Sequence, residues 1–166
     1  DYSCMPQQDN KKYLKTGGAE TRTYEERAEF DLMLTSITDL YLTSYVLILL
    51  DQSYNSRFWT LMESWCAMQK ADAKGLRTAE SGEERYTITC IHNATQGTKE
   101  DLNEVLSRTN AQGMKRMLEK PDVQVTNAKD KMNMLPVIEN TDKHVMKMMK
   151  KFDSSRRDVL VEEVTP

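Results

Sequence analysis

The segment richest in chemically useful side chains spans residues 50–63 and reads LDQSYNSRFWTLME. Glu63 follows Trp59 by four residues, so a helix places both side chains on one face, which is otherwise apolar. A carboxylate held against aromatic rings is a candidate for a raised pKa and for catalysis. The alternative is a structural role, in which Glu63 pairs with Arg57 or with a lysine at the edge of that face.

Two further side chains, Cys90 and His92, alternate along a predicted strand and would face the same side. A cysteine and a histidine can form a nucleophile and its base, but no acid that would orient the histidine is identifiable. Core packing of Cys90 and a strand-end hydrogen bond of His92 are the structural alternative. The three cysteines are far apart and include no CxxC pair. Their spacing predicts neither a metal site nor disulfides, and it favours a reducing, cytoplasmic compartment.

Apolar patterns predict the elements that position these residues. Residues 45–50 are a continuous apolar run, which predicts a strand buried on both faces, and the β-branched residues 86–91 predict a second buried strand. Residues 71–84 are polar and predict a surface loop. Apolar spacing predicts helices over 25–42, 56–70, 98–120 with a break near Gly113, 131–139 and 142–152. The other predicted strands are a stub ending near Cys4 and the short stretch 123–126.

Strands that alternate with helices predict βαβ units with a parallel sheet. The fold class is therefore α/β, with a three-layer, doubly wound, flavodoxin-like sheet covered by helices on both faces. In such sheets a ligand site lies at the carboxyl ends of the strands, here residues 51–56, 91–98 and 126–130.

The composition excludes several classes of protein. The 166 residues carry a net charge of −3, which is not basic enough to suggest nucleic acid as a partner. The longest run of side chains without any polar atom, Val46 to Leu50, has five residues, whereas a membrane-spanning helix needs about 20, so no membrane span is predicted. Residues 143–157 hold six Lys or Arg and one acid on an amphipathic pattern. This stretch is either a solvated outer face or a basic helix for an anionic membrane surface or a partner.

The strand, turn and helix around Glu63 resemble the third strand and following helix of TIR (Toll/interleukin-1 receptor) domains. The matching residues are Val46 to Leu50, Tyr54, Ser56, Trp59 and Glu63. Over residues 1–138 the chain is more closely similar to TIR-like domains of protists and algae, through four segments. These segments are DYSCMPQ (1–7), SRFWTLME (56–63), CIHNA (90–94) and VTNAKDK (125–131).

This resemblance implies an activity. In catalytic TIR domains the glutamate at the position of Glu63 cleaves the nicotinamide–ribose bond of NAD. The ribose gains oxocarbenium character, which a fixed carboxylate stabilises, and the leaving nicotinamide is neutral and needs no general acid. On this interpretation Glu63 is catalytic and NAD is a substrate, with neither a cofactor nor a metal. Arg57 and backbone N–H groups at the helix start would meet the pyrophosphate. The residues that would bind the substrate are Ser56, Arg57 and Trp59.

The family also implies alternatives. TIR domains begin with a central strand and a helix before the segment matched by residues 1–6, and this chain contains neither and has no initiator Met. We therefore expect a TIR-like domain over residues 1–138, truncated at its N-terminus, and a C-terminal helical extension and tail over residues 139–166. Many TIR domains are adaptors without turnover. The alternatives are thus a signalling or scaffold module that self-associates through TIR–TIR contacts, or a structural subunit of a larger protein complex.

Overall fold

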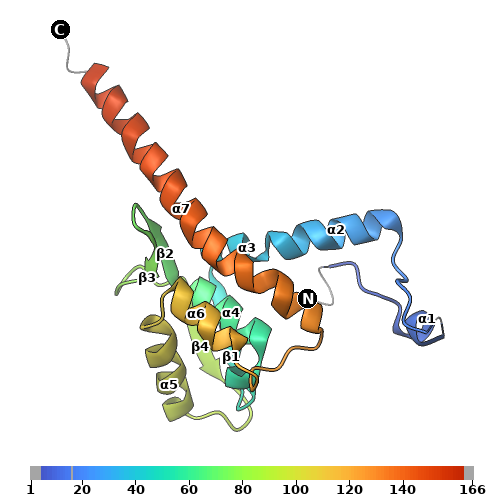
Figure 1. Cartoon of the computed structure of the whole chain (residues 1–166). Coiled ribbons are helices and arrows are strands. Elements are labelled where there is room, and N and C mark those ends of the chain that lie inside the picture. Colours follow the sequence, from blue (N-terminus) through green and yellow to red (C-terminus); the bar gives the residue numbers. More distant parts are fainter. Residues whose placement is uncertain (1–4, 16, 163–166) are drawn as a thin grey trace. The chain divides into compact units, whose positions relative to one another are not determined.

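The computed structural model describes residues 5–15 and 17–162, without the side chains of residues 10, 153 and 155–162 (Figure 1). The chain divides into two compact units, residues 1–40 and 41–166, and each is described by itself. The predicted strand that ends near Cys4 lies outside the described residues. Within them, no helix combines the length and the apolar character that a membrane crossing requires.

The first unit consists of helices with little buried surface. It contains α1 (Asn10–Lys15) and α2 (Tyr24–Thr35), and α2 begins with a capping box. In this box the Glu26 N–H donates to Thr23 Oγ1 (3.2 Å) and the Thr23 N–H donates to Glu26 Oε2 (2.8 Å). None of the side chains of α2 is buried. The predicted helix over residues 25–42 is interrupted at Ser36 and continues as α3 (Ile37–Thr43).

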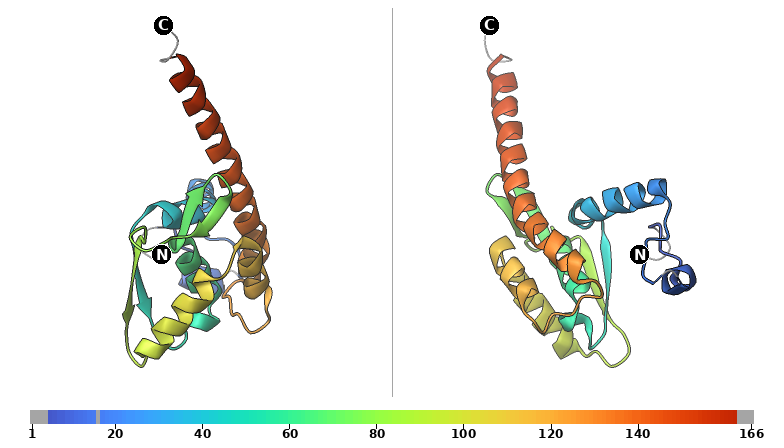
Figure 2. Two further views of the ribbon diagram at one scale, coloured as in Figure 1. Left: turned by 90° about the vertical axis from the view of Figure 1, so that its left-hand side faces the viewer. Right: turned by 45° about the vertical axis from the view of Figure 1, so that its right-hand side comes forward.

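A two-stranded parallel sheet lies in the second unit. β1 (Val46–Leu50) pairs with β4 (Tyr86–Cys90) in a register that sets Ile48 beside Ile88. Ile48 is buried, whereas the next residues on the opposite face, Leu47 and Leu49, are 61% and 48% exposed. The two predicted strands are confirmed, but the prediction that β1 is buried on both faces is wrong. The reason is that the described helices after β1 lie on one side of this sheet (Figure 2).

A separate antiparallel hairpin is formed by β2 (Gln69–Asp72) and β3 (Gly75–Thr78), so the prediction of a loop over residues 71–84 is wrong for these strands. Gly75 has a φ of +112°, and a Cβ at this position would lie 2.5 Å from Asp142 Oδ1. The same Oδ1 accepts the Leu76 N–H at 2.7 Å. A carboxylate from a distant helix therefore holds the hairpin, and a local sequence pattern contains no sign of such a contact.

The remaining helices of the second unit are the 3-10 turn η1 (Tyr54–Ser56), α4 (Phe58–Ala67), α5 (Gln96–Ser107), α6 (Ala111–Glu119) and α7 (Ala128–Glu162). α7 is continuous although Pro136 lies inside it, so the predicted interruption between 139 and 142 is absent. The predicted domain boundary between residues 138 and 139 falls within this helix. α7 packs against α6 and against both strands of the hairpin, as Figures 1 and 2 show. The largest fully buried side chains include Trp65, Phe58, Ile48, Leu50, Leu102, Leu106, Met114, Leu118, Met134 and Ile138.

Residues 123–126 do not form the predicted third strand. The Gln124 N–H donates to the Ser56 carbonyl (2.7 Å) and the Gln124 carbonyl accepts from the Phe58 N–H (2.9 Å), which makes one isolated bridge. The extended stretch is short because Asn127 already initiates α7, where its Oδ1 accepts the Lys129 N–H (3.1 Å). The chain is therefore a mixed α/β protein with a small parallel sheet.

Candidate functional site

α4 holds Glu63 among apolar side chains. The helix begins after Arg57, whose backbone is extended (φ −105°, ψ 129°) and whose side chain makes no capping bond. Trp65 Nε1–H donates to the Thr109 carbonyl (2.6 Å) and fixes α4 against the segment between α5 and α6. The buried side chains of α4 include Phe58, Leu61, Met62 and Trp65. Apolar residues thus occupy most of this helix, and its single carboxylate is removed from water with them.

Glu63 is mostly buried, and its Oε1 has no hydrogen-bond partner among the described residues. Burial raises the pKa of Glu63 from 4.5 to about 7, and a hydrogen bond with Tyr41 opposes that rise. The structural alternative from the sequence, an ion pair of Glu63 with Arg57 or a lysine, is not found in the described part of the chain. Arg57 pairs with Asp51 instead, with 3.2 Å between Nη2 and Oδ2.

Tyr41, at the end of α3, is the neighbour that the sequence analysis missed. Burial raises the pKa of Tyr41, and the Glu63 carboxylate beside it raises that pKa further. The hydroxyl therefore remains protonated and can donate its hydrogen to the carboxylate. Tyr54 and Ser64 add a buried hydrogen bond of 2.6 Å between their hydroxyls, and the Glu63 charge also acts on Tyr54. The sequence analysis placed Tyr41 in the predicted helix over residues 25–42, but it did not indicate which residue Tyr41 meets.

Two of the three predicted substrate-binding residues lie at the turn before α4 and have partners there. Ser56 Oγ donates to the Ser53 carbonyl (2.8 Å). The Arg57 guanidinium pairs with Asp51 and lies 5.6 Å from the centre of the Tyr54 ring. Hydrogen bonds from Ser53 and the Arg57 charge lower the pKa of Asp51. The Arg57 side chain is 44% exposed, so the guanidinium remains accessible to an anion from solvent.

Trp59, the third of these residues, connects α4 to the start of α7. Its ring meets Phe58 edge to face, with 5.6 Å between the ring centres. Burial raises the pKa of Asp130, and the Trp59 side chain beside this carboxylate opposes that rise. Asn127 Nδ2–H donates to the same carboxylate (2.9 Å). As residues i and i+4 of α4, Trp59 and Glu63 share a face and lie about 6 Å apart along the helix axis. The sequence analysis placed Asp130 in the predicted ligand-site stretch 126–130, but it did not indicate Trp59 as its neighbour.

Cys90 and His92 do not form the arrangement of a nucleophile and its base. The Cys90 thiol donates to the Thr95 carbonyl (3.2 Å). His92 lies beyond the end of β4 in a left-handed backbone conformation with φ 51°, so the strand alternation that would align the two side chains has already ended. Within the described ranges, no group of three or more His, Cys, Asp or Glu is arranged to hold a metal ion.

A cavity of about 480 Å³ lies between β4 and α5. None of the four predicted site residues lines it, so the cavity and Glu63 are separate features of the unit. The lining residues are Glu84, Tyr86, Thr87, Ile88, Gln96, Lys99, Glu100 and Asn103.

Comparisons with known proteins find no match for this chain among protein-family models, curated proteins or solved structures. The likeness to TIR domains therefore rests on the residues and spacings of the sequence.

Proposed function

We propose that this chain is a TIR-like domain in which Glu63 assists the cleavage of the nicotinamide–ribose bond of NAD. One observation supports the role of Glu63 above others: the carboxylate is buried, leaves one oxygen without a partner among the described residues and has a pKa of about 7. Burial of an ionisable group without a charged partner costs stability. Such a cost is typical of functional sites, where the group is kept for its chemistry.

In the proposed reaction the bond between the ribose and the nicotinamide nitrogen breaks, and its electron pair stays on the nitrogen. Nicotinamide leaves as a neutral molecule, and the ribose carries the positive charge of an oxocarbenium ion. The ionised carboxylate of Glu63 stabilises this charge, while the Tyr41 hydroxyl holds the carboxylate in one orientation. Water then adds to the ribose and releases a proton, so the products are nicotinamide, ADP-ribose and H⁺.

The proposal extends to the fold, a doubly wound three-layer sheet in which β1 has a strand on each side. The Val46 N–H donates to the Arg85 carbonyl (2.8 Å) and the Leu50 carbonyl accepts from Ile91 (2.9 Å). Strand geometry then turns the backbone groups of Leu47 and Leu49 away from β4. Among the described residues β1 pairs only with β4, so its second edge is open to a further strand.

Released nicotinamide tests the proposal directly. We expect the chain, incubated with NAD, to release nicotinamide, and Glu63→Gln to lower the rate at least about 100-fold, because a neutral amide does not stabilise the cation. Glu104→Gln is the matched control, since Glu104 is exposed on α5 and the charge change is identical. The proposal fails if the folded chain releases no nicotinamide, or if Glu63→Gln is as active as the control. Circular dichroism of all three proteins establishes that they are folded.

A second candidate function is a non-catalytic module that acts through protein–protein contacts, and β1 is the observation that favours it. Tyr45, Leu47 and Leu49 are exposed beside an edge that is unpaired among the described residues. Natural proteins protect such edges with charges, prolines or a covering element, and residues 45–50 contain no charge and no proline. Light scattering on the same samples separates the candidates: a chain that self-associates and releases no nicotinamide is a module.

A further inference from the structure

A surface unrelated to Glu63 lies on the part of α7 that spans residues 143–157. We propose that this part of α7 lies on an anionic lipid membrane, with its apolar side chains against the lipid and its lysines near the headgroups.

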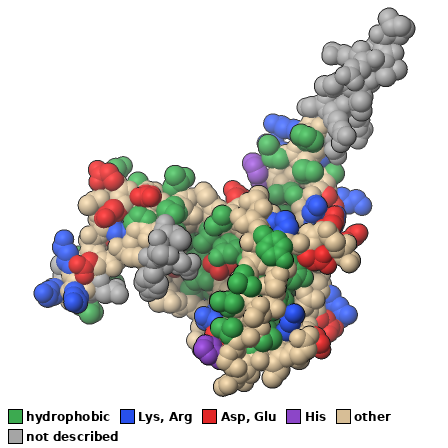
Figure 3. Space-filling model, turned by 180° about the vertical axis from the view of Figure 1, so that it is seen from behind, with side chains coloured by type: hydrophobic (Ala, Val, Ile, Leu, Met, Phe, Trp, Pro, Cys, Tyr) green, Lys and Arg blue, Asp and Glu red, His purple; other side chains and the backbone are tan. Residues whose placement is uncertain are grey.

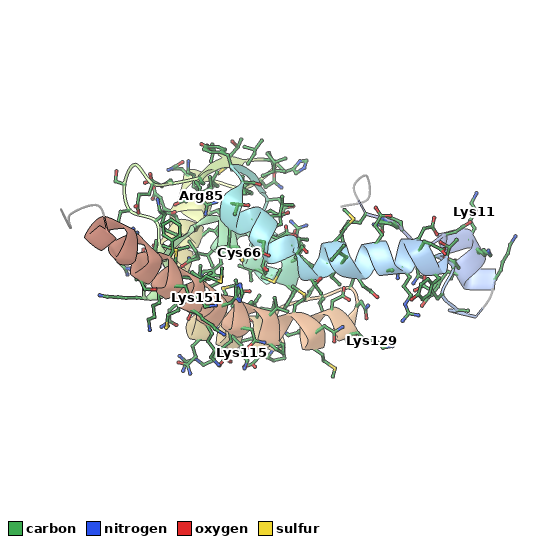
Figure 4. The ribbon with its side chains drawn as sticks, turned by 90° about the horizontal axis from the view of Figure 1, so that it is seen from above. Lys11, Cys66, Arg85, Lys115, Lys129 and Lys151 are labelled. Atoms are coloured by element: carbon green, nitrogen blue, oxygen red, sulfur yellow. The ribbon has the colours of Figure 1, made fainter. Side chains whose placement is uncertain are left out.

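The first argument is charge. Residues 143–157 contain six Lys or Arg and one acid, a net charge of +5, in a chain whose net charge is −3. The remainder of the chain is therefore acidic, and the positive charge is concentrated on this stretch, because the whole of α7 carries eight Lys or Arg against six Asp or Glu. Figure 4 labels Lys151 on the same helix as Lys129, which lies near its N-terminal end. The lysines of this stretch with described side chains lie along the helix at Lys143, Lys147, Lys150 and Lys151.

The second argument is an apolar stripe on the same stretch. Val145, Met148 and Phe152 are spaced by three and four residues, so they lie on one face of the helix. Phe152 is 66% exposed and Met148 is 50% exposed. Figure 3 shows hydrophobic and basic side chains close together on the described part of α7 that projects beyond the other elements of the second unit. A helix with Lys on one side and Phe and Met on the other is suited to a membrane interface.

The third argument decides between a membrane and a protein groove. Val145 is half-buried, so the beginning of the stripe is already partly covered, while Met148 and Phe152 are open. α7 packs against the β2–β3 hairpin and α6 along its earlier part. A protein groove that encloses α7 would have to reach the helix from several sides, whereas a flat membrane needs only one accessible side of the helix. The lysine side chains are long enough to extend from the far side of the helix toward the headgroups.

Sedimentation with lipid vesicles tests this proposal. We expect the chain to bind vesicles of phosphatidylcholine with about one third phosphatidylserine, and to leave vesicles of phosphatidylcholine alone unbound. Because each lysine near an anionic surface strengthens binding about fivefold, Lys150→Glu combined with Lys151→Glu should weaken binding at least about tenfold. Arg116→Glu combined with Lys129→Glu is the matched control: both positions are exposed, the charge change is the same, and binding should not fall. Salt near 1 M should release the chain.

The apolar stripe has its own test. In Phe152→Trp, the fluorescence added by the new indole should shift to shorter wavelength when anionic vesicles are present, because the side chain enters the lipid. The proposal is overturned if the chain binds neither kind of vesicle, which would leave a protein as the partner of this helix. It is also overturned if binding to both vesicles is equal, if the control weakens it as much as the α7 pair, or if the fluorescence of the new indole does not shift.

Discussion

Two glutamates of the second unit, Glu63 on α4 and Glu139 on α7, have pKa values that are shifted in opposite directions. Glu63 on α4 is buried without a charged partner among the described residues, and burial raises its pKa to about 7. Glu139 on α7 lies between Lys143 and Lys115, at 2.7 Å and 3.3 Å, and hydrogen bonds from these lysines lower its pKa. Desolvation dominates at the first carboxylate and positive neighbours dominate at the second. The direction of each pKa shift therefore follows from how deeply the carboxylate is buried and from the charges beside it.

The largest expected effect compares a buried position of α4 with an exposed position in the C-terminal part of α7. Trp65 on α4 is fully buried and donates a hydrogen bond to Thr109, whereas Phe152 on α7 is 66% exposed. We expect Trp65→Ala to lower the free energy of unfolding by about 3–5 kcal/mol, because it leaves a cavity. Phe152→Ala should change that free energy by less than about 0.5 kcal/mol. Urea unfolding of both variants measures the difference, and similar losses would contradict the comparison.

The next effect concerns the proton on Glu63. Its pKa in the folded chain is about 7, above the unfolded value of 4.5, so the folded state binds the proton more tightly. The stability contributed by this proton is fully present below pH 4.5 and is lost as the pH rises through 7. Glu63→Gln has no charge to bury, so at pH 8 it should be more stable than the parent chain by about 3 kcal/mol.

The pH dependence distinguishes this cause from a packing effect. Urea unfolding at about pH 4 should give nearly the same free energy for Glu63→Gln and the parent chain, and the two should diverge between about pH 5 and pH 8. A constant difference at all pH values would mean that the substitution changes packing. A variant that is less stable at about pH 8 would mean that Glu63 has an anionic role in the fold itself.

The sequence was sufficient for elements whose signal is local. The apolar run that contains Ile48 and the β-branched stretch that contains Ile88 predicted β1 and β4, and periodicity predicted α4 with Trp59 and Glu63 on one face. Prediction from the sequence failed where contacts join segments that are distant along the chain. The β2–β3 hairpin depends on Asp142, 66 residues away from Leu76, and the partner of Glu63 comes from α3. Exposure of β1 was missed because an apolar run does not show how many of its faces are covered.

The smallest expected effect is that of Glu139→Gln on stability, and its sign is opposite to that of Glu63→Gln. The pKa of Glu139 is lowered by its lysine neighbours, so its contribution to stability is present above the unfolded pKa and is lost as the pH falls through the folded value. Glu139→Gln should therefore slightly destabilise the chain at about pH 8, where Glu63→Gln stabilises it. The Glu139 effect should vanish once the pH falls below its lowered folded pKa, and the Glu63 effect should vanish below the unfolded pKa of Glu63. Raising the salt concentration should shrink the Glu139 effect, because exposed charges are screened, and leave the Glu63 effect largely intact, because desolvation is not. If the two substitutions changed the unfolding free energy in the same direction at about pH 8, burial would not be what separates these glutamates.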